Sequence, residues 1–157
     1  MLCKEELLEK YESLRKYWLE EAPSNLFNGS ELDFMNQYNI DIESELINRS
    51  ERYSAIKHIG NIIYNYKDYE KRINKFVNRL QDKWYRLWEK SFARIEKESC
   101  HWKREDFESR EAYKEYLEDD IAYPYGWNSD AAYDALVIEN ILGDITKITN
   151  EHYELSF

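Results

Sequence analysis

Few of the side chains that could carry out chemistry stand at the spacings that catalysis requires. The three histidines, His58, His101 and His152, are widely separated, and the four glycines are isolated, so the chain has no glycine-rich phosphate-binding loop. Cys100 and His101 are adjacent, but adjacent side chains rarely bind one ion, and no second pair completes a zinc site. We therefore expect a non-enzymatic protein with no catalytic residues, no metal and no other cofactor.

Protein recognition is a chemistry that the sequence does support. A run of carboxylates directly precedes a loop that contains proline and glycine, residues 119–130, and that carries three large aromatic rings. Aromatic anchors inside a charged rim are typical of binding hot spots, although the rings could instead pack against the end of the fold. The expected partner-binding residues of this acidic–aromatic loop are Glu118, Asp119, Asp120, Tyr123, Tyr125 and Trp127.

The charges are strongly segregated along the chain, which has a net charge of −10. Residues 1–48 have a net charge of −7, residues 49–104 of +8 and residues 105–157 of −11. Acidic surfaces attract basic clefts, which are common in nucleases and nucleic-acid-guided effectors, and such complementarity raises association rates. The acidic ends therefore favour a protein partner with a basic surface, such as a nucleic-acid-processing enzyme or effector.

Within the basic segment the cations follow a helical period. Successive members are 4, 4, 4, 3, 4, 4 and 3 residues apart, so on a helix they form one stripe about 39 Å long, opposite the apolar side. This basic stripe comprises Lys71, Lys75, Arg79, Lys83, Arg86, Lys90, Arg94 and Lys97. Three explanations remain open: electrostatic matching to the acidic segments within the fold or between protomers, contact with nucleic-acid phosphates, and plain solvation of a helix face.

The composition predicts a helical fold that positions these residues. The 157 residues include only 4 Gly and 2 Pro, which are too few turn residues for a sheet protein, and 43% are hydrophobic. We expect one all-α domain over residues 1–157, a helical bundle built around one long central helix with shorter N- and C-terminal helices.

The ends of the shorter helices are indicated by caps and by proline. The first helix is expected over residues 4–21, because Pro23 should end it. Ser30 should cap a short second helix, and Ser109 should cap another over residues 110–118.

The long central helix is expected from residue 42 to about residue 99, and its apolar seam runs from Tyr53 through Tyr66 to Ile95 with spacings that are mostly 3 or 4. A continuous helix of this length would span roughly 85 Å, so we expect either a break near Gly60 or an extended, oligomeric shape. The final helix should be capped by Asn128 or Ser129. Its seam comprises Ala131, Ala135, Ile138, Leu142, Ile145 and Ile148.

Targeting signals and composition bear on localisation. The N-terminus is charged from Lys4 and the longest apolar run has four residues, so we expect neither a signal peptide nor a membrane span. Cys3 and Cys100 form no CxxC pair, which favours a reducing cytoplasm. Asn, Lys, Ile and Tyr, whose codons are AT-rich, are abundant, which indicates a bacterial host cell or its phage. In size and composition the chain is similar to small phage-encoded inhibitors, such as anti-CRISPR and anti-restriction proteins, and to acidic immunity proteins, but no motif carries this resemblance.

Three functions follow from these patterns. We favour a non-enzymatic inhibitor or regulator that binds a basic surface of a nucleic-acid-processing protein through the acidic–aromatic loop. The alternative is a helical nucleic-acid-binding accessory or recombination-mediator protein that uses the basic stripe. A further alternative is an oligomeric structural assembly subunit whose long seam drives association.

Overall fold

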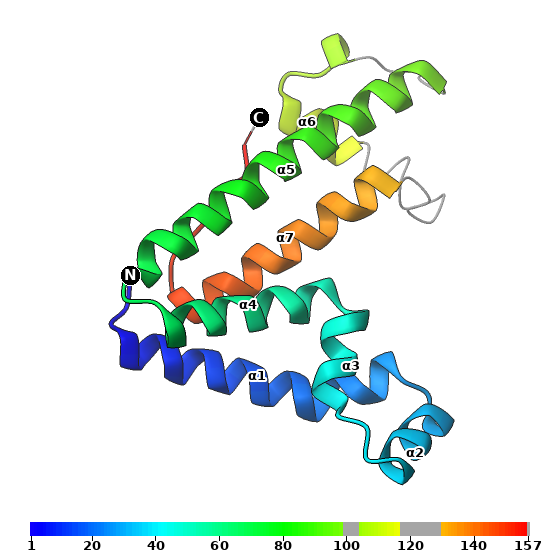
Figure 1. Cartoon of the computed structure of the whole chain (residues 1–157). Helices are drawn as coiled ribbons and strands as arrows, with labels where there is room; N and C mark the ends of the chain where they lie inside the picture. The colour runs from blue at the N-terminus through cyan, green and yellow to red at the C-terminus, as the bar shows by residue number, and fades with distance from the viewer. Residues whose placement is uncertain (99–103, 117–129, 157) are drawn as a thin grey trace. The chain divides into compact units, whose positions relative to one another are not determined.

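The regular secondary structure of the described residues is entirely helical, as the composition predicts. A computed structural model describes residues 1–98, 104–116 and 130–156, and within these ranges it contains α-helices, one short 3₁₀ helix and no strand (Figure 1). None of the helices in the described ranges combines the length and the apolar character that crossing a bilayer requires.

The described residues form two compact units. Unit 1 comprises Met1–Lys75 and Asn140–His152, and unit 2 comprises the described residues of Phe76–Glu139 and Tyr153–Phe157. Each unit contains part of α5 (Tyr69–Glu98) and part of α7 (Asp130–Thr149).

Unit 1 is built on α1 (Lys4–Leu26) and α4 (Glu51–Asn65), which pack along one another, while α3 (Ile42–Arg49) contacts both (Figure 1). Gly60 of α4 packs tightly against α1, because a Cβ atom there would lie 2.1 Å from the ring of Tyr11. The side chains in the centre of this unit are almost completely buried: Leu7, Tyr11, Leu46, Tyr53, Ile56, Ile59 and Ile63.

The first helix is longer than predicted, because α1 continues through Pro23 to Leu26. A proline inside a helix removes one hydrogen-bond donor. The last turn nevertheless closes, since the backbone N–H of Phe27 donates to the carbonyl oxygen of Pro23 over 2.9 Å. Both residues are buried, and Phe27 packs in a cluster with Leu46 and Tyr53. Tertiary packing of this turn therefore outweighs the lost hydrogen bond.

The predicted cap of the second helix is also wrong, since α2 (Gly29–Gln37) is capped by Asn28 and not by Ser30. The Asn28 side chain accepts a hydrogen bond from the backbone N–H of Glu31 over 2.8 Å. The Glu31 carboxylate in turn accepts one from the backbone N–H of Asn28 over 3.4 Å. This reciprocal arrangement satisfies two donors that would otherwise have no partner at the helix start.

The long central segment is broken, as expected, but not at Gly60. It forms three helices, α3, α4 and α5, which are separated at Ser50 and at residues 66–68. Ser50 ends α3 through its backbone N–H, and its hydroxyl caps α4 by accepting a hydrogen bond from the backbone N–H of Tyr53. Gly60 lies inside α4, where its missing side chain makes room for Tyr11.

Unit 2 contains α6 (Arg110–Tyr116) beside its parts of α5 and α7. The start of α6 confirms the prediction, because the Ser109 hydroxyl accepts a hydrogen bond from the backbone N–H of Ala112 over 3.1 Å. Trp88 of α5 and Tyr113 of α6 are buried in this unit. The predicted seam of the final helix is confirmed, because all six of its residues are buried.

Candidate functional site

The acidic–aromatic loop lies outside the described residues. All six of its expected binding residues fall within residues 117–129, as does the expected cap of the final helix. Cys100 and His101 fall within residues 99–103, which are likewise not described. The binding role of this loop therefore stays a prediction.

The basic stripe is exposed wherever its side chains are described. The exposed members are Lys71, Lys75, Arg79, Lys83, Arg86 and Lys90. The side chains of Arg94 and Lys97 lie outside the description. The opposite side of α5 is buried, with Trp84, Trp88 and Ser91 at 2% exposure or less. The exposed part of the stripe is about 28 Å long at 1.5 Å per residue, and its predicted position opposite the apolar seam is confirmed.

None of these six cations forms an ion pair with a carboxylate in the described part of the chain. The only side-chain hydrogen bond recorded there for any of them runs from Arg86 Nε to the backbone oxygen of Asp82, one turn earlier, over 3.4 Å. Electrostatic matching within the described residues therefore does not account for the stripe.

Basic residues that precede the stripe, by contrast, do have acidic partners. Arg49 lies 2.6 Å from a carboxylate oxygen of Glu31, and Lys57 lies 2.7 Å from one of Glu43. Both carboxylates belong to the acidic first 48 residues. Pairing with the acidic N-terminal segment thus accounts for Arg49 and Lys57. The cations of the stripe have no such pairing with the described residues.

Glu43 is the centre of a partly buried charge network in unit 1. Arg15 and Lys57 both donate hydrogen bonds to it, and the buried ring of Tyr53 lies beside it. Burial alone would raise the pKa of Glu43, but the hydrogen bonds from Lys57 and Arg15 outweigh burial and lower it. The same carboxylate raises the pKa of Lys57, and burial raises that of Tyr53. This network stabilises the fold around one ionised carboxylate.

A second buried carboxylate, Asp144, joins α7 to α4 within unit 1. It is 1% exposed, and its two oxygens accept hydrogen bonds of 2.9 Å each from Nε and Nη2 of Arg52. The Arg52 guanidinium also lies 5.1 Å from the ring centroid of Trp18. Sequence reasoning missed this pair, because 92 residues separate its members and neither belongs to a local motif.

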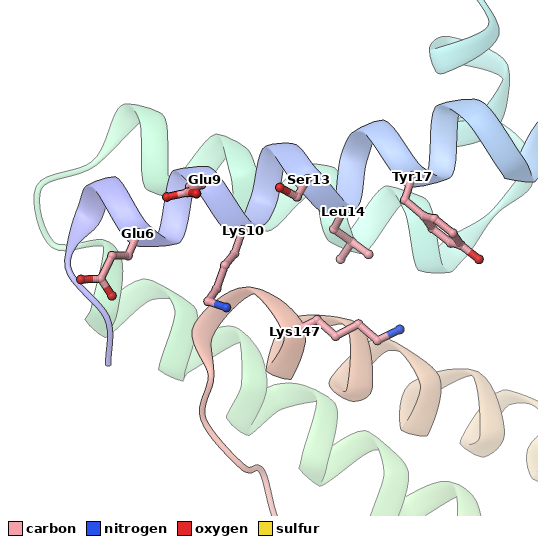
Figure 2. A pocket seen from close by; sticks show the side chains of 7 residues that line it. All are labelled: Glu6, Glu9, Lys10, Ser13, Leu14, Tyr17 and Lys147. Atoms are coloured by element: carbon pink, nitrogen blue, oxygen red, sulfur yellow. The ribbon is translucent and has the colours of Figure 1, made fainter.

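A pocket with side chains of both charges lies along α1 in unit 1 (Figure 2). Its volume is about 660 Å³, and the side chains of Lys10 and Leu14 face Lys147 of α7 across it. Glu6 and Glu9 line its N-terminal end. The mixed charge and the polar lining give this pocket no preference for one class of ligand.

In unit 2 one carboxylate beside the stripe, Glu89, already forms ion pairs. Glu89 of α5 stands between Arg86 and Lys90 in sequence, and it accepts hydrogen bonds from Arg104 over 3.1 Å and from Arg110 over 3.0 Å. Two cations from outside the stripe therefore neutralise a charge that would otherwise repel phosphate.

One residue pair beside the stripe was not identified from the sequence. Tyr66, which the periodicity placed in the buried seam, is 42% exposed because α4 ends one residue earlier. The guanidinium carbon of Arg72 lies 3.7 Å from the centroid of its ring. Arg72 stands seven residues before Arg79 and therefore lies on the same side of α5. This spacing is visible in the sequence and would have assigned Arg72 to the same helix face as the stripe.

The described residues contain no group of three or more His, Cys, Asp or Glu side chains arranged to hold a metal ion. No protein-family model matches the chain, and no curated protein sequence or solved structure shows significant similarity to it. A functional assignment must therefore come from the arrangement of its own residues.

Proposed function

We propose that this protein is a non-enzymatic, helical nucleic-acid-binding accessory protein that contacts phosphates through the basic stripe of α5. The observation that supports the proposal is that six cations follow one exposed helix face and have no ion-pair partner among the described residues, whereas Arg49, Arg52 and Lys57 do. A mediator of recombination or replication is one such accessory protein.

The physical reason is the way in which cations gain affinity for nucleic acid. Lys and Arg that approach phosphates release condensed counterions, and each contact adds to the salt dependence of binding. A cation that already pairs with a carboxylate must first give up that partner, whereas the described cations of the stripe need not. The stripe is therefore the part of the described surface best suited to phosphate.

The net charge of −10 is only a weak argument against nucleic-acid binding by the stripe. At physiological salt the interaction between exposed charges is largely screened beyond about 8 Å, so distant carboxylates weigh little. On α5 itself, Glu89 is neutralised by Arg104 and Arg110. Asp82 is the exposed carboxylate that stays within the stripe.

The test is binding of fluorescent oligonucleotides, measured by anisotropy at 50 and 200 mM salt. If all six described cations contact a single strand, the slope of log K against log salt is about −4, and affinity falls about 300-fold across this range. The variant R79A/K83A/R86A/K90A should flatten the slope to about −1.4, which leaves a fall of about sevenfold. Alanine favours helix, so this variant should keep its helical content.

A matched control removes the same charge from elsewhere. Lys4, Lys10, Lys16 and Lys147 are exposed on α1 and α7, so K4A/K10A/K16A/K147A changes the net charge equally. It should bind with nearly the parental slope. Equal losses in both variants would mean that net charge alone matters, and absence of binding at either salt concentration would refute the proposal.

A second candidate function is the inhibitor or regulator that docks on a basic surface of a nucleic-acid-processing protein. It is favoured by the net charge of −11 in residues 105–157 and by the carboxylates that precede the aromatic loop. Replacing Glu118, Asp119 and Asp120 by Lys should abolish capture of such a partner while helicity is retained. Undiminished capture would remove these residues from the site.

A further inference from the structure

Tyr66 occupies the connection between α4 and α5 and is held there by the backbone. It is the C-cap of α4, with extended backbone angles (φ −128°, ψ 137°), and its backbone N–H donates to the carbonyl oxygen of Ile62 over 3.1 Å. Its side chain is 42% exposed. The ring is therefore fixed at its base and accessible to a ligand.

Arg72 packs its guanidinium over this ring. Its Nε donates to Asp68 Oδ1 over 2.8 Å, and its guanidinium carbon lies 3.7 Å from the centroid of the Tyr66 ring. The same hydrogen bond lowers the pKa of Asp68. The Arg72 side chain is nevertheless 46% exposed, so the pair is both positioned and accessible.

We propose that Tyr66 and Arg72 form a stacking platform for a nucleobase, and that the basic stripe consequently binds single-stranded nucleic acid in preference to duplex. This inference rests on the proposed function of the stripe. Proteins that bind single strands combine a row of cations along the backbone with aromatic side chains or Arg on which bases stack. An unpaired strand offers free base faces along its whole length, whereas a duplex offers them only at its two ends.

The position of the platform fits a strand that follows the stripe. Arg72 lies on the same face of α5 as Arg79 and Lys83, 7 and 11 residues further on, which places them within about 20° around the helix axis. Successive cations rise about 5–6 Å along the helix, which is close to the separation of neighbouring phosphates in an extended strand. A flexible strand can place each phosphate on such a straight row.

A duplex fits the same row less well. Its phosphates wind around the helix axis once in about 34 Å, so a straight, convex row of cations meets only a few of them. The geometry of the row therefore favours the single strand.

The experiment compares a fluorescent single strand of about 12 thymidines with a duplex of equal length. The variants are Tyr66→Ala, which removes the ring, and Arg72→Lys, which keeps the charge but loses the planar guanidinium. Each should weaken binding of the single strand about 5- to 150-fold, the range expected for one stacked base, with the salt slope unchanged. Tyr66→Trp should retain the affinity. Tyr17→Ala, at an exposed tyrosine of α1, is the control and should bind normally.

A strand that contains 2-aminopurine gives a direct readout of stacking. Its fluorescence should be quenched by the parental protein and by Tyr66→Trp but not by Tyr66→Ala, a difference that a merely structural role of Tyr66 would not produce. Equal affinities for the single strand and the duplex, together with normal binding by Tyr66→Ala, would overturn the platform. The proposed function would still stand in that case if the variant R79A/K83A/R86A/K90A flattened the salt slope. Absence of binding to both probes would refute the proposed function, and the platform with it.

Discussion

The Arg52–Asp144 pair predicts unequal effects of removing its two members. The Asp144 side chain is 2% exposed, whereas that of Arg52 is 37% exposed. If Arg52 is replaced by Met, the Asp144 carboxylate keeps its buried position and loses both of its 2.9 Å hydrogen bonds. If Asp144 is replaced by Asn, the guanidinium can still reach water, and the new amide oxygen can still accept one hydrogen bond.

The magnitudes follow from this asymmetry. Removing one partner from a buried ion pair costs about 3–5 kcal/mol when the other charge cannot be hydrated, which is the situation after Arg52→Met. Asp144→Asn loses about one charge-assisted hydrogen bond and keeps the remaining charge partly solvated, so we expect a loss of about 1–2 kcal/mol. The double variant Arg52→Met/Asp144→Leu leaves no buried charge, and should be at least about 2 kcal/mol more stable than Arg52→Met alone.

Urea denaturation followed by circular dichroism at 222 nm measures these free energies of unfolding at pH 7. The reasoning would be refuted if Arg52→Met were no more destabilising than Asp144→Asn. It would also fail if the double variant were as unstable as Arg52→Met.

Three further predictions concern unit 1. Gly60→Ala places a Cβ 2.1 Å from the Tyr11 ring and should lower the free energy of unfolding by about 1–3 kcal/mol. Gly143→Ala meets open space and should raise the free energy of unfolding by about 0.5–1 kcal/mol in the same urea titration. Asn28→Ala removes the cap of α2 and should cost about 1 kcal/mol, with Asn28→Asp as the control that keeps it. Folding lowers the pKa of Glu43, so the ionised carboxylate stabilises the fold above pH 4.5, and this stabilisation is lost as the pH falls through the lower pKa of the folded state. Glu43→Gln should therefore cost about 2 kcal/mol of unfolding free energy at pH 7 and less in acid. A constant difference between the two proteins from pH 7 to pH 3 would contradict this.

The sequence by itself determined the features that depend on a local period. Apolar residues at spacings of three and four identified the buried side of α7, from Ala131 to Ile148, because a helix repeats every 3.6 residues whatever it packs against. The same geometry placed the basic stripe on the exposed side of α5. Ser109 was recognised as a cap because its hydroxyl acts within three residues.

Only the tertiary structure decided where helices end and which charges are matched. Pro23 does not end α1 because distant side chains bury the turn that follows it, and Gly60 breaks no helix because it makes room for Tyr11. Likewise, Arg52 forms an ion pair with a carboxylate 92 residues away, whereas Lys71 to Lys90 of the stripe form no ion pair within the described part of the chain. Such outcomes depend on contacts between segments far apart in the chain, and a local pattern contains no information about which segments will meet.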